Sequence, residues 1–195
     1  MPKKRLFISL NPDQNVLNEL GKIQQNLKEK YPVHNIRWGE SDKLHLTLRF
    51  LGDINEENIP ALAGTLERLK FDFETISFET DRIGFFPDNK YPNVIYAGLI
   101  ESGNNTELLI GFIDKIIFNF GVKPDKKFIP HITLGRFNRS KRIKINEPEN
   151  TAINKFTVEF DSFNLMQSSL TPDGSVYELI NIFNSFVVDA KPDGI

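Results

Sequence analysis

Two related segments decide how this 195-residue chain folds: Leu44-His45-Leu46-Thr47-Leu48-Arg49 and Pro130-His131-Ile132-Thr133-Leu134-Gly135-Arg136. Each alternates apolar with polar residues, which is the pattern of a β-strand that buries one of its faces. In such a strand a histidine and the threonine two positions later project from the same face. Both segments therefore predict a strand that presents a His-x-Thr pair on one side and a row of Leu or Ile side chains to a core on the other.

The sequence before each motif has the same order of elements, which indicates an internal duplication. An apolar strand, at residues 6–10 or 94–100, is followed by an amphipathic helix and then by the His-x-Thr strand. A hairpin-rich segment follows each motif. Two copies of so long a unit are typical of two pseudo-symmetric lobes and not of a solenoid, so both motifs are expected to face one shared cleft.

Three helices are expected from apolar spacing and from capping residues. The first follows Asn11-Pro12-Asp13, which supplies an N-cap, an N1 proline and a first-turn acid. The second is expected at about 56–70 with Asn55 as its cap, and the third ends before Gly121, which suits the C′ position. Extended segments are expected at residues 44–51, 73–86, 94–100, 128–137, 155–168 and 176–188, the last two as a hairpin about the turn at 171–174.

The composition narrows the class of protein. The length suits one domain, residues 1–195, made of two interleaved lobes. The chain has no cysteine, which excludes disulfides and thiolate chemistry and leaves three histidines as the groups that titrate near neutrality. The apolar run at 6–10 is too short for a signal peptide, and no stretch approaches the roughly 20 residues of a membrane helix. A cytoplasmic monomer without membrane contact is expected.

The charge argues against a protein that coats nucleic acid, because the net charge is −2. Basic residues gather between 123 and 144, around His131, where attraction to a phosphate backbone and a merely solvated loop are equally consistent with the pattern. Any contact with nucleic acid is therefore expected to be local.

Chance explains the paired motifs poorly, since two of the three histidines have a threonine two positions later. A purely structural role for each histidine would explain one motif better than two at equivalent places in a repeat. A zinc site needs three or four ligands, and neither motif has a cysteine or a closely spaced acid beside it. We therefore expect no metal and no cofactor.

Hydrolysis of a cyclic phosphodiester matches what two opposed histidines can do. Water attacks phosphorus in line with the departing ribose oxygen, so a base is needed on one side and an acid on the other. An imidazole with an ordinary pKa of roughly 6.5 can serve in either state at neutral pH. The hydroxyls of Thr47 and Thr133 can donate to the non-bridging phosphate oxygens, whose negative charge grows in the transition state.

On the strength of its two His-x-Thr motifs, the chain resembles the 2H phosphoesterase superfamily. Within that superfamily it resembles the bacterial and archaeal RNA 2′,3′-cyclic phosphodiesterases, historically called 2′-5′ RNA ligases. The resemblance spans nearly the whole chain. Its specific part is the pair of His-x-Thr motifs, supported by Arg5-Leu6-Phe7-Ile8, by Ile36-Arg37-Trp38, and by Phe50-Leu51-Gly52 after the first motif.

The resemblance implies a bilobal α+β fold in which two antiparallel sheets line a central cleft with helices outside. It implies hydrolysis of the 2′,3′-cyclic phosphate at an RNA end, tRNA fragments included, to a 2′-phosphomonoester, and a weak reversible 2′-5′ joining activity. His45 and His131 would be acid and base; we assign His131 as base and His45 as acid, although the symmetry permits the reverse. Thr47, Thr133 and Arg136 would bind the substrate.

Some residues carry two interpretations at this stage. Strict alternation puts Arg136 on the face opposite His131, so its role requires a bulge or bend near Gly135. Arg49 would share the His45 face, where it is a phosphate ligand or a plain surface arginine. Trp38 and Tyr177 could meet the substrate, although core packing suits Trp38 as well, and His34 reads as a solvated loop residue.

Two other functions remain open. One is a noncatalytic module that binds RNA ends with the same residues. The other is a 2H enzyme for a small substrate, such as a nucleoside cyclic phosphate or cyclic ADP-ribose phosphate. A measurement of turnover distinguishes the binding module from an enzyme. The relative rates on mononucleotides and oligonucleotides distinguish a small-substrate enzyme from one that acts on RNA ends.

Overall fold

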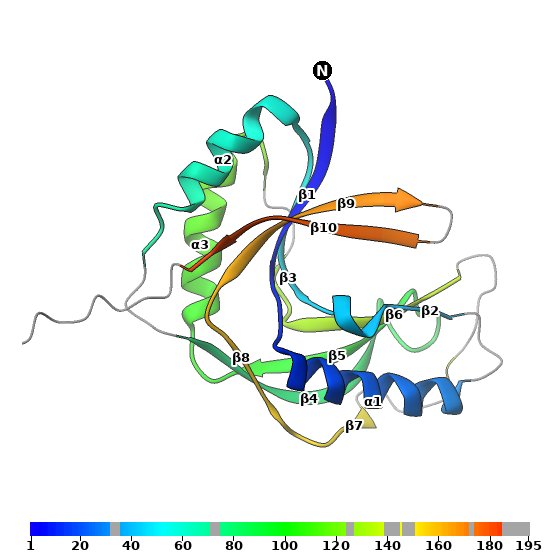
Figure 1. Cartoon of the computed structure of the whole chain (residues 1–195). Coiled ribbons are helices and arrows are strands. Elements are labelled where there is room, and N and C mark those ends of the chain that lie inside the picture. The colour runs from blue at the N-terminus through cyan, green and yellow to red at the C-terminus, as the bar shows by residue number, and fades with distance from the viewer. Residues whose placement is uncertain are drawn as a thin grey trace, which may run out of the picture.

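The computed structural model describes residues 1–31, 36–70, 75–123, 127–138, 145, 151–171 and 174–184 (Figure 1). The elements along the chain are β1 (Lys3–Leu10), α1 (Gln14–Lys30), β2 (Ile36–Trp38), η1 (Ser41–Lys43), β3 (Leu46–Asn55), η2 (Glu56–Asn58), α2 (Ile59–Leu66), β4 (Ile76–Phe86), β5 (Val94–Glu101), α3 (Asn105–Phe118), β6 (His131–Phe137), β7 (Thr151–Ala152), β8 (Thr157–Phe160), β9 (Phe163–Thr171) and β10 (Gly174–Phe183). The α+β class expected from the sequence is thereby confirmed.

The strands form one curled antiparallel sheet in the order β10-β9-β1-β3-β6-β5-β4-β7, with β2 paired to β6 and β8 paired to β4. The two expected sheets are the two halves of this sheet. Their junction lies between β3 and β6, where Leu46 is paired with Ile132. Both side chains are fully buried, so the two motif strands meet through the apolar residue at the centre of each motif.

Capping residues set the ends of the helices, in one case differently from the prediction. Asp13, and not Asn11, is the N-cap of α1, because its side chain accepts a hydrogen bond from the amide of Val16 at 2.8 Å. At the end of α3 the prediction is confirmed. Gly121 has φ +79°, and the amide of Val122 donates to the carbonyl of Ile117, as in a Schellman motif.

The second helix begins later than predicted. Residues Glu56–Asn58 form a 3-10 turn, Asn55 makes no side-chain cap, and α2 starts at Ile59. The reason is Pro60, which has no amide hydrogen to donate to the carbonyl four residues earlier and so belongs in the first turn of a helix. The sequence did not predict β2 or β7, and β8 is a strand separate from β9 that pairs with β4.

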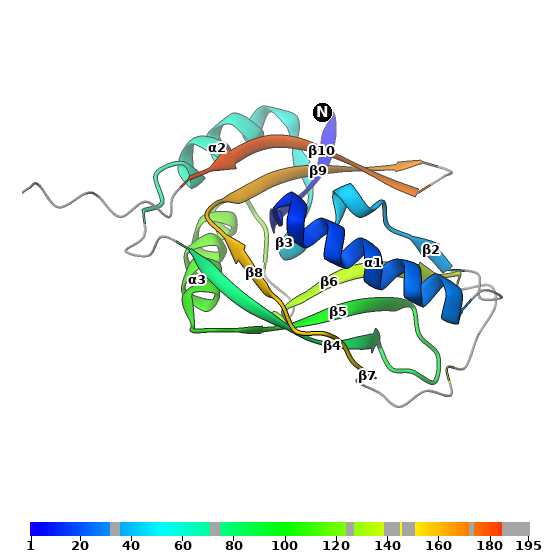
Figure 2. The same ribbon diagram turned by 60° about the horizontal axis from the view of Figure 1, so that its bottom comes forward.

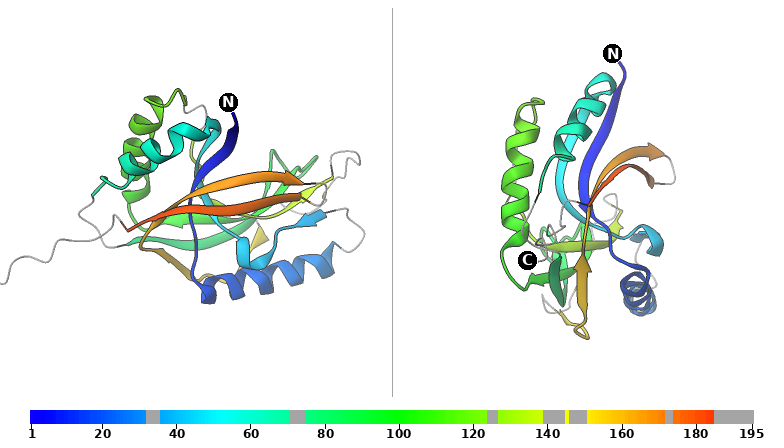
Figure 3. Two further views of the ribbon diagram at one scale, coloured as in Figure 1. Left: turned by 45° about the horizontal axis from the view of Figure 1, so that its top comes forward. Right: turned by 60° about the vertical axis from the view of Figure 1, so that its left-hand side comes forward.

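Each half of the sheet is tied to a helix from the other half of the sequence. In α1, the Gln24 side chain donates to the carbonyls of Gly39 and Leu134, both at 2.9 Å, which holds the helix against β6. In α3, Asp114 binds Arg49 of β3. Figures 2 and 3 show α1 on one side of the molecule and the adjacent helices α2 and α3 on another.

One contiguous core joins these elements. It contains Leu6 and Ile8 of β1, Leu20 of α1, Ile113 of α3 and Ile132 of β6, all essentially inaccessible to solvent. Among the described residues, no helix is long and apolar enough to cross a membrane.

Candidate active site

The β3–β6 junction brings the two His-x-Thr motifs side by side. Because Leu46 is paired with Ile132, the register sets His45 beside Thr133 and Thr47 beside His131. All four side chains are half-buried and project from the sheet face opposite the two core residues, which we call the histidine face. The two histidines are then diagonal neighbours, about 7–8 Å apart along the sheet and somewhat closer between their Cβ atoms, which leaves room for one phosphate group between them.

The two imidazoles are held in the same way. Nδ1 of His45 lies 2.9 Å from the carbonyl oxygen of Lys43, and Nδ1 of His131 lies 2.7 Å from that of Ile129. A carbonyl oxygen can only accept, so each Nδ1 carries a proton and donates. Each Nε2 is the reactive nitrogen: in the neutral ring it can accept a proton, and in the charged ring it can donate one. Either histidine can serve as base or as acid.

Two aromatic rings surround each histidine. Phe7 stacks on His45 with the ring centroids 5.0 Å apart, and the Tyr177 ring lies edge-on at 5.0 Å. Phe86 and Tyr96 contact the His131 ring at 5.0 and 5.3 Å. The sequence singled out only Tyr177 among these four as a candidate. The others follow from strand register, which the sequence pattern does not give.

The surroundings lower the pKa of both histidines below the ordinary value of 6.5. Burial is the main cause in each case, because it disfavours the charged imidazolium. The hydrogen bonds from Nδ1 to the backbone carbonyls oppose this effect. The positive charge of Arg136 lowers the pKa of both rings further, and His131 adds to the effect on His45. Both rings are therefore mainly neutral at pH 7 in the free protein.

Arg136 reaches the histidine face through a bulge near Gly135, as the substrate-binding role implied by the resemblance required. On β5, Ile95 is paired with Gly135 but the next residue, Tyr96, is paired with Thr133, so Leu134 is the extra residue. This shift places Arg136 on the same face as Thr133. The Arg136 side chain is exposed, and its influence on both histidine pKa values shows that it lies near both rings.

A corresponding bulge in β3 removes Arg49 from this face, contrary to strict alternation. Ser9 is paired with Thr47 and Ile8 with Arg49, so Leu48 is the extra residue. Arg49 turns to the helix side, where Nε and Nη2 donate to the Asp114 carboxylate at 2.7 and 2.9 Å. The position equivalent to Arg136 is instead taken by Phe50, which is 67% exposed.

The remaining candidates are placed as follows. Trp38 is paired with Gly135 and packs against the core, which favours the packing interpretation over base stacking. Tyr177 contacts His45. His34 lies outside the described residues, and so do most of the basic residues between 123 and 144, namely Lys126, Arg139, Lys141, Arg142 and Lys144. The same holds for residues 185–188, at the end of the hairpin predicted about the turn at 171–174, and for residues 172–173 of that turn.

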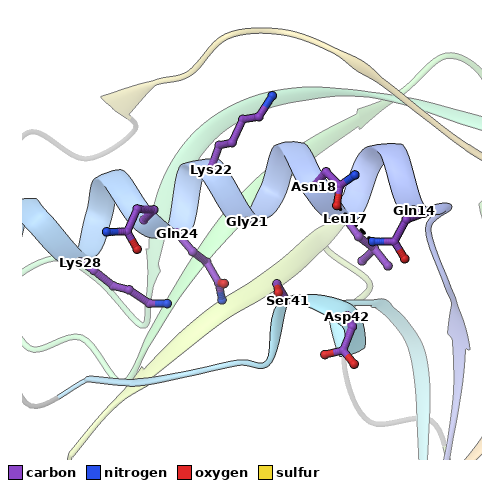
Figure 4. A pocket seen from close by; sticks show the side chains of 10 residues that line it. Gln14, Leu17, Asn18, Gly21, Lys22, Gln24, Lys28, Ser41 and Asp42 are labelled. Carbon is purple, nitrogen blue, oxygen red and sulfur yellow. Dashed lines mark hydrogen bonds between the residues drawn. The ribbon is translucent and has the colours of Figure 1, made fainter.

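A groove of about 450 Å³ lies elsewhere, between α1 and η1. Gln14, Asn18, Lys22 and Ser41 line it, among other residues, and no predicted site residue is among them (Figure 4). It contains no group that titrates near neutrality, so it does not compete with the histidine face as a place for acid–base chemistry. Within the described ranges, no three His, Cys, Asp or Glu side chains gather closely enough to hold a metal ion.

The histidine face thus brings together two imidazoles, two hydroxyls and the Arg136 guanidinium, and neither Nε2 has a hydrogen-bond partner among the described residues. A phosphate group between the rings would have a proton acceptor on one side and a proton donor on the other. The hydroxyls and the guanidinium would surround its non-bridging oxygens. This is an arrangement suited to in-line displacement at phosphorus.

Comparison with known families and proteins gives consistent matches. The model of the family described as LigT like Phosphoesterase matches residues 10–96 and 103–177. A protein of Archaeoglobus fulgidus is 32% identical over 180 residues, which is 92% of this chain and 99% of that protein. One of Methanocaldococcus jannaschii is 30% identical over 179 residues, which is 90% of this chain and 98% of that protein. Both are named RNA 2′,3′-cyclic phosphodiesterase.

Solved structures share the fold. A Thermus thermophilus structure superposes with a TM-score of 0.71 at 27% identity and covers 92% of this chain and 96% of its own. The apo form of Escherichia coli LigT superposes with a TM-score of 0.72 at 21% identity and covers 94% of this chain and 98% of its own. The similarity therefore extends over the whole architecture, both halves of the sheet included.

Proposed function

Because this chain belongs to the LigT-like phosphoesterase family, we propose that it hydrolyses the 2′,3′-cyclic phosphate at an RNA end to a 2′-phosphomonoester. The observation that carries the proposal is the pair of half-buried imidazoles on one face of the sheet, each with Nδ1 bound to a carbonyl and Nε2 unbonded to any other described residue. The relatives named RNA 2′,3′-cyclic phosphodiesterase support the substrate class, since they match almost end to end.

In the reaction, the oxygen of a water molecule forms a bond to phosphorus while the bond from phosphorus to O3′ breaks. Nε2 of His131 accepts the proton that the water loses, and Nε2 of His45 donates a proton to the departing O3′. The products are a 2′-phosphate and a free 3′-hydroxyl. Each proton transfer of this kind contributes on the order of 10²–10⁴-fold to the rate.

Thr47, Thr133 and Arg136 bind the phosphate in this proposal. The hydroxyls donate to the non-bridging oxygens, and the Arg136 guanidinium neutralises the charge that accumulates on them as water attacks. These interactions strengthen in the transition state, so they accelerate the chemical step and do not merely tighten substrate binding.

The lowered histidine pKa values fit this cycle. A neutral ring is ready to act as the base, whereas the acid must carry a proton. The negative charge of the bound phosphate favours the imidazolium and offsets the effects of burial and of Arg136. Substrate binding would therefore supply the protonated partner at neutral pH, and the chemistry requires no metal.

Further features belong to the same proposal. When the 5′-hydroxyl of another RNA strand takes the place of water, its oxygen bonds to phosphorus as the bond to O3′ breaks, which leaves a 2′-5′ phosphodiester and gives a weak, reversible 2′-5′ ligase activity. The RNA partner would be a cleaved strand with a cyclic phosphate end, tRNA fragments included. The protein would act in the cytoplasm as a monomer, with residues 1–195 as one domain of two interleaved lobes.

The test is turnover of an oligoribonucleotide that ends in a 2′,3′-cyclic phosphate, with excess chelator present and the product identified by phosphorus NMR. We expect hydrolysis at an undiminished rate and a 2′-phosphate product. Binding without turnover would favour a noncatalytic RNA-end-binding module. Turnover confined to nucleoside cyclic phosphates or cyclic ADP-ribose phosphate would favour a small-substrate enzyme, and loss of activity with chelator would contradict the metal-free mechanism.

A further inference from the structure

Arg37 shares the histidine face with Arg136. Strands β2 and β6 are antiparallel, and Arg37 is directly paired with Arg136. Paired residues on neighbouring strands project from the same face, with Cα atoms roughly 5 Å apart. Since the bulge after Thr133 puts Arg136 on the histidine face, Arg37 projects from that face too. Both side chains are exposed.

Arg37 lies further from the histidines than Arg136 does. Strands β3 and β2 lie along the same edge of β6. Leu46 of β3 is paired with Ile132, whereas Arg37 of β2 is paired with Arg136, four residues further along β6. The Arg37 side chain extends towards the β9–β10 hairpin: a Cβ atom placed on Gly174 would be 3.4 Å from its Cδ and 3.6 Å from its Nη1. Figures 2 and 3 show β2 on the same side of the molecule as the paired ends of β9 and β10.

The two arginines form an uncompensated positive pair among the described residues. Three of the other four described arginines have carboxylate partners: Arg5 pairs with Asp53, Arg49 with Asp114 and Arg82 with Asp81. The fourth, Arg68, donates to the Thr65 hydroxyl. No such ion pair involves Arg37 or Arg136 in the described part of the chain. Like charges directly opposite one another on a sheet repel. A bound anion for each would remove that repulsion.

We propose that Arg37 binds the phosphodiester immediately upstream of the terminal cyclic phosphate, while Arg136 binds the cyclic phosphate itself. The inference rests on the proposed function and adds a second phosphate subsite to it. The upstream strand would leave the histidine pair past Arg136 and run towards the β9–β10 hairpin. A nucleoside 2′,3′-cyclic phosphate has no upstream phosphodiester, so Arg37 selects oligonucleotides over mononucleotides.

The experiment compares kcat/KM for two substrates, an oligoribonucleotide with a 2′,3′-cyclic phosphate end and a nucleoside 2′,3′-cyclic phosphate. Arg37→Gln should lower the value for the oligonucleotide about tenfold, the loss of one charge-assisted phosphate contact, and leave the value for the mononucleotide unchanged. The matched control is Arg68→Gln, which removes an exposed arginine just beyond α2 and should change neither value.

The salt dependence gives a second readout. Removing one phosphate contact to a single strand should reduce the slope of log kcat/KM against log salt concentration by about 0.7 for the oligonucleotide. Arg37→Lys should retain the wild-type slope. Circular dichroism verifies that each variant is folded.

Two results would overturn the inference alone: an equal loss on both substrates, which would place Arg37 at the cyclic phosphate, or no loss on either. Wild-type protein inactive on both substrates would instead overturn the proposed function, and the inference with it.

Discussion

Near His45 and His131, the backbone decides which nitrogen can react. Each Nδ1 is bound to the carbonyl two residues earlier, Lys43 in one case and Ile129 in the other. This shared geometry fixes the same tautomer in both rings and directs both Nε2 atoms away from the backbone. The aromatic rings that enclose each imidazole restrict its rotation and, by excluding water, lower its pKa.

We expect NMR titration of the free protein to give pKa values for both imidazoles below 6.5, and Arg136→Met to raise both. The reason is that Arg136 disfavours the charged ring, so its removal makes protonation easier at any given pH. Inorganic phosphate should raise both values in the wild-type protein, because an anion favours the imidazolium. Arg68→Met should leave them unchanged; histidine pKa values at or above 6.5 without phosphate would contradict this account.

At the level of strands, the bulge after each threonine determines which side chains reach the histidine face. Leu134 is the extra residue in β6 and Leu48 is the extra residue in β3. Without the first, Arg136 would point into the core. The second turns Arg49 away to Asp114. The two halves thus share a bulge, but they place different residues, Arg136 and Phe50, five positions after the histidine.

Gly135, beside the bulge in β6, has no room for a side chain. A Cβ there would lie 2.8 Å from Cγ2 of Ile36 and 3.3 Å from the carbonyl oxygen of Arg37. Gly135→Ala should therefore push β2 from β6 and reduce the free energy of unfolding by about 1–3 kcal/mol, with loss of activity. Gly64→Ala in α2, where a Cβ meets nothing within 4 Å, should stabilise the protein by about 0.5–1 kcal/mol. Urea denaturation measures both, and equal effects would contradict the packing described.

Local patterns predicted most elements but not the details that depend on distant partners. The alternation of apolar and polar residues predicted the two motif strands, and Gly121 predicted where α3 ends. The need for a bulge near Gly135 followed from the substrate-binding role that the family resemblance implies for Arg136. The resemblance implied no such role for Arg49, and an arginine by itself is acceptable on either face. Asn11 and Asp13 are both good N-caps, and only the helix register decides between them.

Across the whole molecule, helices from each half of the sequence contact strands from the other: α1 is held to β6 and α3 to β3. The repeated order of elements predicted two related lobes and two converging motifs. It did not predict the Leu46–Ile132 junction or the rings around each histidine, because strand order and register arise from contacts between residues far apart in sequence. Most of the basic region at 123–144 lies outside the described residues, so neither interpretation of it, attraction to a phosphate backbone or a solvated loop, is tested.

The shared core predicts that both lobes unfold together. Differential scanning calorimetry should show one transition with equal calorimetric and van't Hoff enthalpies. Leu46→Ala, at the fully buried junction, should lower that single transition by removing about 2–5 kcal/mol of stability. Leu170→Ala, at a side chain that is 73% exposed, should have little effect. Two resolved transitions would contradict the proposal of a single domain.

The central claim is that His45 and His131 act on one phosphorus atom in one step. Single-turnover hydrolysis of a cyclic-phosphate oligoribonucleotide by His45→Ala, His131→Ala and the double variant tests it most directly, with His34→Ala as the control. We predict that each single variant is slower by roughly a thousandfold and that the double variant is no slower than the slower single one, because residues that act as a unit are non-additive. A double variant slowed by the product of the two single factors, or a single variant with the wild-type rate, would contradict the account.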